Sequence, residues 1–532
     1  MSSWDAIVIG AGHNGLIASA YLANAGQKVL VLERRPVIGG CTVTEEIIPG
    51  YKFSRASYVN SLLRPQIIHD LRLKDHGFQL FPRRPASFTP LEDGRHLLLG
   101  SNSALNVQEI SKFSRRDAEA FPRYESQLDR FARFIEPTLD TPPPDPASSS
   151  WTERIQSCAS IGKMGMRALK LGTSLPSFFE LLTAPARRVL ERWFESEPLL
   201  GTLATDAVIG AMASPSSPGS GYVLFHHVMG ESDGARGVWA YVRGGMGALA
   251  DAIAAAAKAR GVTIETERSV GRILVEGNTA VGVALEDGTE IRAPRVLSAV
   301  DPRLTFLSFL ENGVLPDDFR RHIATWDFSS AVTKINVAVD RVPNFACLPG
   351  DGVSPHHHGT IHMNSSLADI ESAYEDAVCG RCSRRPVIEM TIPSALDDSL
   401  APDGHHVISL FVQYTPYTLR EGSWEDPATG EAFADRVFDD IEKHAPGFKE
   451  SVVGREVLSP LDLERIFGLT GGNIFHGAMS LDQLFWLRPA AGWARHRTPV
   501  RRLYLCGAGA HPGGGVLGAP GRNAALVALN DR

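Results

Sequence analysis

Three glycines near the N-terminus have the spacing of a loop that holds a phosphate group. Gly10, Gly12 and Gly15 form a G-x-G-x-x-G motif between an apolar run, residues 6–9, and an alanine-rich segment with helical spacing. In this motif the first glycine permits a tight turn, the second lets the backbone approach a diphosphate, and the third lets helix and strand pack closely. The helix N-terminus adds free N–H groups. The motif therefore predicts a dinucleotide-binding site.

A carboxylate follows where such a site binds a ribose. Glu33 comes directly after a second apolar run, residues 29–32, and its oxygens can accept hydrogen bonds from ribose hydroxyls. Arg34 comes next, and the Gly39-Gly40 pair brings a further stretch of backbone close to the nucleotide. No second strand–G-x-G-x-x-G–helix unit occurs in the sequence, so we expect one bound dinucleotide.

A second glycine-rich loop lies near the C-terminus. It reads CGAGAHPGGG over 506–515 and leads into a helix predicted over 516–529. Gly507, Gly509, Gly515 and Val516 would let the backbone approach a flat ligand, and the N-terminus of the new helix stabilises negative charge there. His511, inside this loop, is the candidate catalytic residue because it could hydrogen-bond the cofactor or substrate; a packing role is the alternative.

These motifs resemble those of the FAD-dependent phytoene desaturase and amine oxidase superfamily. The resemblance extends over nearly the whole chain, and its segments include GGMGAL at 244–249, SRASYVNSLLRPQI at 54–67, SPGSGYVLFHHVMG at 217–230 and GGNIFHGAMSLDQLFWLRP at 471–489. It implies FAD as the cofactor, with the backbone of Val270 against the adenine. Many phytoene desaturases carry Arg after the Gly-Gly pair, where this chain has Cys41, so a side-chain contact with the ribityl–phosphate region is not expected.

The order of the elements predicts the fold class. Parallel strands alternate with helices at both ends and near the middle of the chain, which indicates an α/β protein with a discontinuous, glutathione-reductase-like FAD-binding Rossmann domain and an inserted α+β substrate domain. We expect residues 1–100, 236–312 and 491–532 in the FAD-binding domain. Residues 101–235 and 313–490 would then form the substrate or partner domain.

The resemblance implies an oxidoreductase that transfers a hydride from a substrate C–H to the flavin. Its substrate would be an extended apolar molecule such as a polyene or retinoid. The sequence shows no obvious acid–base constellation, which fits hydride transfer from an unactivated C–H. Two alternatives stay open: a flavin-fold protein that acts mainly as a regulatory binding partner, and an amine oxidase with an aromatic pair that the sequence does not identify.

The composition limits which binding partners and which cellular compartment are expected for the protein. The chain has 53 Lys and Arg against 60 Asp and Glu and no dense basic run, so a nucleic-acid partner is not expected. No apolar run is long enough to span a membrane, and a stripe with Phe178, Phe179 and Trp193 allows at most peripheral membrane contact. We expect a soluble intracellular protein. A family member that the chain resembles throughout implies the mitochondrial matrix and a respiratory-complex protein as partner, although no targeting segment is visible; otherwise the protein would be cytoplasmic.

Histidine and cysteine groups are interpreted as structural rather than chemical. His356 to His358 with His362 are expected to lie in a solvated loop, so no metal site is predicted. His226 and His227 are expected to follow an aromatic-rich strand and to serve packing. The Cys379-x-x-Cys382 pair is expected to be incidental surface cysteines rather than a redox pair.

Overall fold

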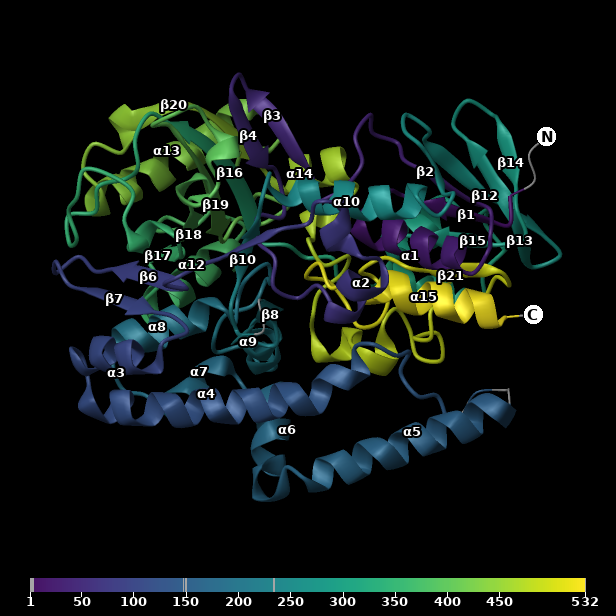
Figure 1. Ribbon diagram of the computed structural model, residues 1–532, viewed down its shortest axis with the longest axis horizontal. Helices are drawn as coiled ribbons and strands as arrows, with labels where there is room; N and C mark the ends of the chain where they lie inside the picture. The colour runs from purple at the N-terminus through teal and green to yellow at the C-terminus, as the bar shows by residue number, and fades with distance from the viewer. Residues whose placement is uncertain (1–3, 147, 149–150, 233–234, 532) are drawn as a thin grey trace.

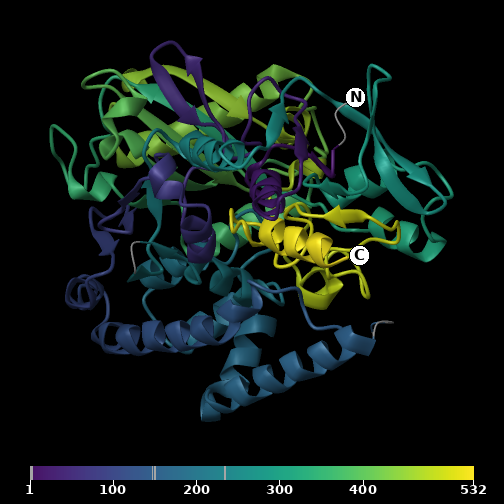
Figure 2. The ribbon, with the colours of Figure 1, turned by 45° about the vertical axis from the view of Figure 1, so that its right-hand side comes forward.

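Two large β-sheets organise the chain, and the segments that build each of them alternate along the sequence (Figure 1). The computed structural model describes residues 4–146, 148, 151–232 and 235–531. One sheet lies beside both termini, and the other lies on the opposite side of the molecule (Figures 1 and 2). Residues far apart in sequence therefore meet where the two halves join.

The first sheet has five parallel strands in the order β11-β2-β1-β15-β21. Their bounds are β1 (Ala6–Ile9), β2 (Val29–Leu32), β11 (Thr263–Glu265), β15 (Val296–Ser298) and β21 (Leu503–Leu505). Residues 6–9 and 29–32 were predicted as strands and are confirmed. Their continuous apolar runs are explained by burial on both faces of the sheet.

Helices cover one face of this sheet and a small sheet covers the other. Ala6 and Val8 pack toward three helices: α1 (His13–Asn24), α10 (Met246–Lys258) and α15 (Ala519–Asn530). Ile7 and Ile9 pack toward an antiparallel sheet of β12 (Val270–Glu276), β13 (Thr279–Leu285) and β14 (Glu290–Arg292). The last helix begins later than the predicted residue 516 because Gly518 adopts a left-handed conformation just before it.

The second sheet has seven strands in the order β20-β16-β19-β18-β17-β6-β7. They are β6 (Ser87–Pro90), β7 (His96–Leu99), β16 (Val332–Val339), β17 (Thr360–Met363), β18 (Val387–Thr391), β19 (His406–Gln413) and β20 (Val452–Leu458). All pairs are antiparallel except β6 with β17. Residues 1–100 thus supply strands to both sheets, although we expected them in the FAD-binding domain alone; the remaining domain bounds stay a prediction.

A helical layer lies below the second sheet and reaches toward the first (Figure 1). It contains α3 (Ser103–Ser111), α4 (Arg115–Ile135), α6 (Leu175–Thr183), α7 (Ala186–Glu191), α8 (Glu197–Thr205) and α9 (Ser220–Val228). Pro185 separates α6 from α7 and so divides the helical pattern of residues 174–194. His226 and His227 were expected after a strand; they are in helix α9, whose residues 220–227 are buried all round.

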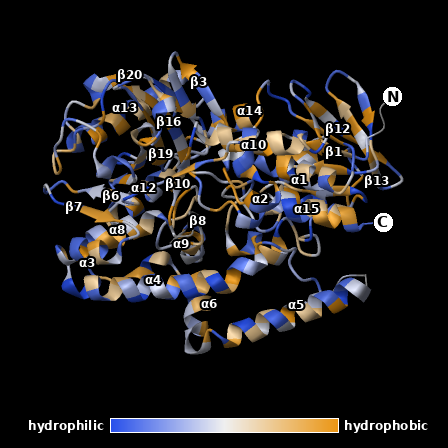
Figure 3. Cartoon of the chain, in the orientation of Figure 1, coloured by the Kyte–Doolittle hydropathy of each residue, from blue (hydrophilic) through white to orange (hydrophobic). Residues whose placement is uncertain are grey.

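Helix α5 (Trp151–Leu169) is the outermost element of the molecule, and apolar residues alternate with polar ones along it (Figure 3). Trp151, Met166 and Leu169 are exposed. Within the described ranges, no helix combines the length and the apolar character that crossing a bilayer would require.

The other elements connect these layers. They are α2 (Pro65–Asp70), α11 (Asp317–Ala324), α12 (Leu367–Val378), α13 (Pro427–His444), α14 (Pro460–Phe467), β3 (Thr44–Ile48) paired with β4 (Tyr51–Ser54), β5 (Leu80–Pro82) paired with β10 (Ala240–Val242), and β8 (Glu231–Ser232) paired with β9 (Ala235–Arg236).

Candidate functional site

A cavity of about 920 Å³ runs between the two halves of the molecule. At one end its wall is formed by the glycine turn after β1 and by Glu33. At the other end it is formed by side chains of the seven-stranded sheet and of helices α4 and α8. The two ends belong to one continuous space, so a ligand held by the glycine turn can face a second molecule bound deeper in.

The glycine turn has the geometry that a diphosphate needs. Gly10 has a φ of +92°, and a Cβ on Gly15 would lie 2.1 Å from the carbonyl oxygen of Gly10, so both positions require glycine for the protein's own backbone. Gly12 differs. A Cβ there would meet only the carbonyl oxygen of Gly39, at 3.9 Å, and would otherwise point into the cavity. The space beside Gly12 is therefore available to a ligand.

Glu33 is held in place by the turn that it faces. Its Oε2 accepts a hydrogen bond from the backbone N–H of Ala11 at 2.9 Å, and its Oε1 accepts one from the N–H of Arg35 at 3.0 Å. The residue is buried, yet it lines the cavity. Each oxygen keeps a lone pair for a further donor, which is what the two hydroxyls of a ribose would supply.

Three buried polar atoms near the start of α1 have no partner among the described residues. These are Nε2 of His13, Oδ1 of Asn14 and Nδ1 of His476, and all three residues line the cavity. Buried polar atoms are normally hydrogen-bonded, so orphaned ones point to a missing ligand. The two imidazole nitrogens can donate to a diphosphate, as can the N–H groups of α1 beside the space at Gly12, while Oδ1 of Asn14 can accept from a hydroxyl of the same ligand.

Most of the predicted cofactor residues meet on the cavity wall. Gly10, Gly12, Gly15, Glu33, Arg34, Gly40, Val270, Gly515 and Val516 all line it. Arg34 also donates from Nη2 to the carbonyl oxygens of Arg465 and Ile466, which anchors it to the end of α14. Direct contact of each residue with the cofactor stays a prediction.

Three predicted glycines lie behind the wall. Gly39 donates its N–H to the carbonyl oxygen of Ala11 at 2.9 Å. A Cβ on Gly507 would lie 2.3 Å from the carbonyl oxygen of Ala299, and one on Gly509 would lie 2.3 Å from Cδ of Pro302. These glycines therefore let the C-terminal loop and the β2 loop pack closely against the segments that carry the cavity wall.

His511, the candidate catalytic residue, does not line the cavity. It is buried, and its Nε2 lies 2.9 Å from the carbonyl oxygen of Thr138. Burial lowers the pKa of His511 to about 4, so the ring is neutral at physiological pH. Its catalytic role stays a prediction, and the contacts observed are those of a residue that packs the C-terminal loop against the turn after α4.

Sequence reasoning missed Arg488, which organises the loops around the cavity. The residue is fully buried, and its guanidinium donates to the carbonyl oxygens of Ala508 at 2.9 Å, Gln483 at 3.0 Å and Phe475 at 2.6 Å. Ala508 and Phe475 both line the cavity. Arg488 thereby joins the C-terminal glycine loop to residues 475–483.

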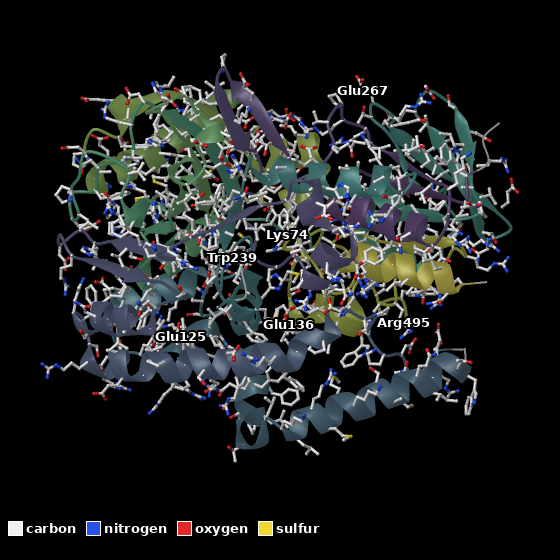
Figure 4. The ribbon with its side chains drawn as sticks, in the orientation of Figure 1. Lys74, Glu125, Glu136, Trp239, Glu267 and Arg495 are labelled. Carbon is white, nitrogen blue, oxygen red and sulfur yellow. The ribbon has the colours of Figure 1, made fainter. Side chains whose placement is uncertain are left out.

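Sequence reasoning also missed a polar chamber at the inner end of the cavity. Its wall contains Tyr58, Arg83, Asp206, His362 and Glu389, which come from five separate stretches of the chain. Trp239, which Figure 4 labels near the middle of the molecule, above Glu125 on α4, lines the same cavity, and its carbonyl oxygen accepts a hydrogen bond from Nε of Arg83. No spacing in the sequence could have revealed this group, because only the tertiary fold brings its members together. The sequence shows no obvious acid–base constellation, and it is the fold that brings these titratable side chains to one cavity.

The histidines expected in a solvated loop are mostly buried. His356 and His357 pack against Phe345, and Nε2 of His357 lies 2.9 Å from the carbonyl oxygen of Pro343. His362 is in β17 and lines the cavity. The solvated-loop expectation is wrong because His356 and His357 are in a short 3-10 helix (Pro355–His357) that packs on the aromatic core, and His362 is in a strand of the seven-stranded sheet.

The cysteines show no pairing. All six are free thiols; Cys379 is exposed, and Cys382 is partly exposed. Cys41 lines the cavity beside Gly40, and burial raises the pKa of its thiol to about 12. A thiol at this position stays protonated at physiological pH and is a poor nucleophile.

Comparisons with known proteins agree with this site. The model of the flavin containing amine oxidoreductase family matches residues 15–525. A rat protein named pyridine nucleotide-disulfide oxidoreductase domain-containing protein 2 is 55% identical over 99% of this chain and 94% of its own length. A lycopene-forming phytoene desaturase from Pantoea ananas is 26% identical over 98% of each chain. The crystal structure of a putrescine oxidase bound to putrescine matches with a TM-score of 0.61 and 16% identity, covering 99% of each chain, and so has the same fold.

Proposed function

Since the chain belongs to the flavin-containing amine oxidoreductase family and is an FAD-dependent oxidoreductase, we propose that it removes a hydride from a C–H bond of an extended, largely apolar small molecule. The observation that carries this proposal is the continuity of the cavity. One space of about 920 Å³ leads from the glycine turn, where FAD binds, to an inner region bounded by the second half of the molecule.

Much of that inner region is apolar. Side chains that contribute hydrocarbon surface to the cavity wall include Leu62, Leu99, Phe121, Leu128, Leu203 and Ile209. Apolar surface of this kind favours a ligand that is itself removed from water on binding. The phytoene desaturase among the relatives is named for dehydrogenation of a polyene, which supports the same class of substrate for this chain.

The protein's own residues would position the two reactants. Glu33 orients the ribose, the turn at Gly12 and the N-terminus of α1 hold the diphosphate, and the loop at Ala508 and Gly515 holds the flavin against the cavity. Bound FAD would supply the hydride acceptor; the proton from the adjacent atom would pass to solvent, and a quinone, dioxygen or NAD would reoxidise the cofactor.

Amine oxidation is a second candidate, and the polar chamber is the observation that favours it. Asp206 and Glu389 both face the cavity, and a carboxylate pair can bind an ammonium group. Arg83 in the same chamber opposes a cationic ligand, so we rank this candidate below the first.

Anaerobic reduction of the flavin tests both candidates. The FAD-loaded protein is mixed with polyenes, with long-chain alcohols and with amines, and the visible absorption of the flavin is followed. Bleaching by a polyene or an apolar alcohol is expected. Bleaching by amines alone would establish the second candidate instead, and no bleaching by any compound in the three groups would refute the proposal.

A further inference from the structure

The inner chamber is more polar than a wholly apolar substrate requires. Arg83, Glu389 and His362 are each at most 5% exposed and line the cavity. Enclosing charged groups beside hydrocarbon is costly unless they are hydrogen-bonded or bind a ligand. The question is which of these groups already have partners and which are left for a ligand.

The guanidinium of Arg83 is held in position without being neutralised. Its Nη1 donates to Oγ1 of Thr360 at 2.5 Å, and its Nε donates to the carbonyl oxygen of Trp239 at 3.4 Å. Across the part of the chain that the structure describes, no carboxylate comes within ion-pair distance of it. Cζ of Arg83 also lies 5.6 Å from the ring centroid of Tyr241, whose hydroxyl interacts with the guanidinium. A guanidinium has five N–H donors, so Arg83 keeps a donor for a ligand.

No structural role accounts for the presence of the Asp206 carboxyl group in this chamber. The residue caps the C-terminus of α8, where the helix dipole disfavours a negative charge. Its carboxyl group makes no hydrogen bond or ion pair to any residue with described coordinates. Burial raises the pKa of Asp206 to about 7, while the charge of Arg83 opposes that shift. Asp206 therefore lies within the electrostatic reach of Arg83 but does not touch it.

Glu389 also lines the chamber. Its Oε2 accepts a hydrogen bond from Oη of Tyr58 at 3.2 Å, and Nδ1 of His362 lies 3.6 Å from its Oε1. Burial, together with the nearby charge of Asp206, raises the pKa of Glu389 to about 8. Among the three acidic and basic groups Arg83, Asp206 and Glu389, the carboxyl of Asp206 is thus the one without a described side-chain partner, and Arg83 is the one with donors to spare.

The hydrogen-bonding properties of Arg83 and Asp206 indicate which end group of a ligand could bind both of them. An ammonium group would be repelled by Arg83 and offers no acceptor to it. A carboxylate would be repelled by Asp206 and offers that group no proton. A hydroxyl group is neutral, accepts one hydrogen bond and donates another, and so matches both.

We propose that the inner chamber binds a terminal hydroxyl group of the substrate, whose oxygen accepts a hydrogen bond from Arg83 and whose proton is donated to Asp206. The inference rests on the proposed function, because it makes the substrate an apolar alcohol whose chain extends from the chamber toward the flavin. It concerns binding alone, so it can be tested separately from hydride transfer.

The test compares four probes that share one polyene chain: retinol, retinoic acid, retinylamine and the corresponding hydrocarbon without an end group. Binding to the FAD-loaded protein is measured by quenching of tryptophan fluorescence. We expect retinol to bind at least about tenfold more tightly than the hydrocarbon, since a buried hydrogen bond to a charged group contributes about 1.5–3 kcal/mol. Equal binding of retinol and the hydrocarbon, or tighter binding of the acid or the amine, would overturn the proposal.

A substitution at Asp206 tests whether the preference for the hydroxyl group arises in the inner chamber. Asp206→Ala should lower retinol affinity about tenfold and leave hydrocarbon affinity unchanged, whereas Asp403→Ala, an exposed surface position, should change neither. If Asp206→Ala fails to fold, the probe series on the unaltered protein still decides. Tight retinol binding, together with no flavin bleaching by any polyene, alcohol or amine, would refute the proposed function and leave the hydroxyl site standing. Bleaching by the hydrocarbon with no preference for retinol would do the reverse.

Discussion

The backbone N–H of Ala11 donates to Oε2 of Glu33 at 2.9 Å and so joins the middle of the glycine turn to the end of the neighbouring strand. Because the N–H of Arg35 occupies the other oxygen, the plane of the carboxylate is fixed before any cofactor arrives. A ribose binding here meets a carboxylate that loses little conformational freedom, which favours affinity.

Glu33→Gln should therefore weaken FAD binding about tenfold or more, because the amide cannot accept at both positions and hydrogen bonds to a charged group are worth about 1.5–3 kcal/mol. Titration of the apoprotein with FAD, followed by flavin fluorescence, measures the change. The matched control is Glu119→Gln on the exposed face of α4, which should bind FAD normally. An unchanged affinity for Glu33→Gln would mean that the ribose lies elsewhere.

Gly12→Val should give a folded protein that no longer binds FAD. Its φ of −68° is accessible to any residue, and an added Cβ meets no protein atom closer than 3.9 Å, so the larger side chain of valine is expected to extend into the space of the ligand. Thermal unfolding of the apoprotein should be nearly unchanged while bound flavin is lost. Gly162→Val, at an exposed helical position with nothing within 4 Å, is the control. Retention of flavin by Gly12→Val would contradict the placement of the diphosphate.

The N-terminal strand–turn–helix could be predicted from sequence because its information is contiguous. Residues 6–9 and 29–32 are strands as predicted, and the three glycines between them determine the turn. The Asp287-Gly288 pair, a dipeptide typical of hairpin turns, is another contiguous signal and lies between β13 and β14.

The polar chamber could not be predicted, because its members are distant in sequence. Asp206 and Glu389 are unremarkable until α8 and β18 bring them to the same cavity. His362 was interpreted from its histidine neighbours, yet its environment is set by pairing of β17 with both β18 and β6. The glycine turn at one end of the cavity is therefore recognisable from contiguous residues. The polar chamber at the other end depends on the pairing of strands that are distant in sequence.

The contribution of Glu389 to the unfolding free energy should fall as pH rises through the window set by its carboxyl group. Its pKa is raised from 4.5 to about 8 in the folded protein, so between those values the folded state holds a proton that the unfolded state has released. This contribution is complete below about pH 4.5 and is lost above about pH 8, with a slope of at most about 1.4 kcal/mol per pH unit. Asp206 adds the same sign up to about pH 7.

Denaturant titrations of the unaltered protein and of Glu389→Gln at several pH values between 5 and 7 isolate this contribution as a difference. Groups of opposite sign are common to both proteins; they include Lys334, whose pKa burial lowers to about 7, and buried histidines such as His511 and His226, whose pKa values burial lowers to about 4 and about 3. Because glutamine has no proton to lose, the unfolding free energy of Glu389→Gln should rise more steeply, or fall less steeply, with pH than that of the unaltered protein. Glu119→Gln should leave the pH dependence as in the unaltered protein. An unchanged pH dependence in Glu389→Gln would show that this carboxyl does not make the expected contribution.

The Cys379→Ser, Cys382→Ser double variant should reduce its flavin at the unaltered rate. Neither thiol lines the cavity, and Cys379 lies at the exposed end of α12. Stopped-flow reduction by the substrate found in the bleaching assay measures the rate. Cys41→Ser is the comparison, because Cys41 does line the cavity and a change there should alter FAD affinity. A large loss of rate in the double variant would instead indicate dithiol chemistry.

Arg488→Met should lower both stability and cofactor affinity. Methionine fills much of the same volume but leaves the carbonyl oxygens of Phe475, Gln483 and Ala508 without their donor, at a cost of at least about 3 kcal/mol in total. Arg488→Lys keeps the charge but cannot span all three acceptors, so its loss should be intermediate. Chemical denaturation measures the free energy of unfolding, and FAD titration measures affinity. Ala508 lines the cavity and Arg488 does not. If FAD affinity decreases in the order Arg, Lys, Met at position 488, the guanidinium acts by positioning the C-terminal loop. If affinity stays constant while the free energy of unfolding falls, the loop keeps its position without the guanidinium.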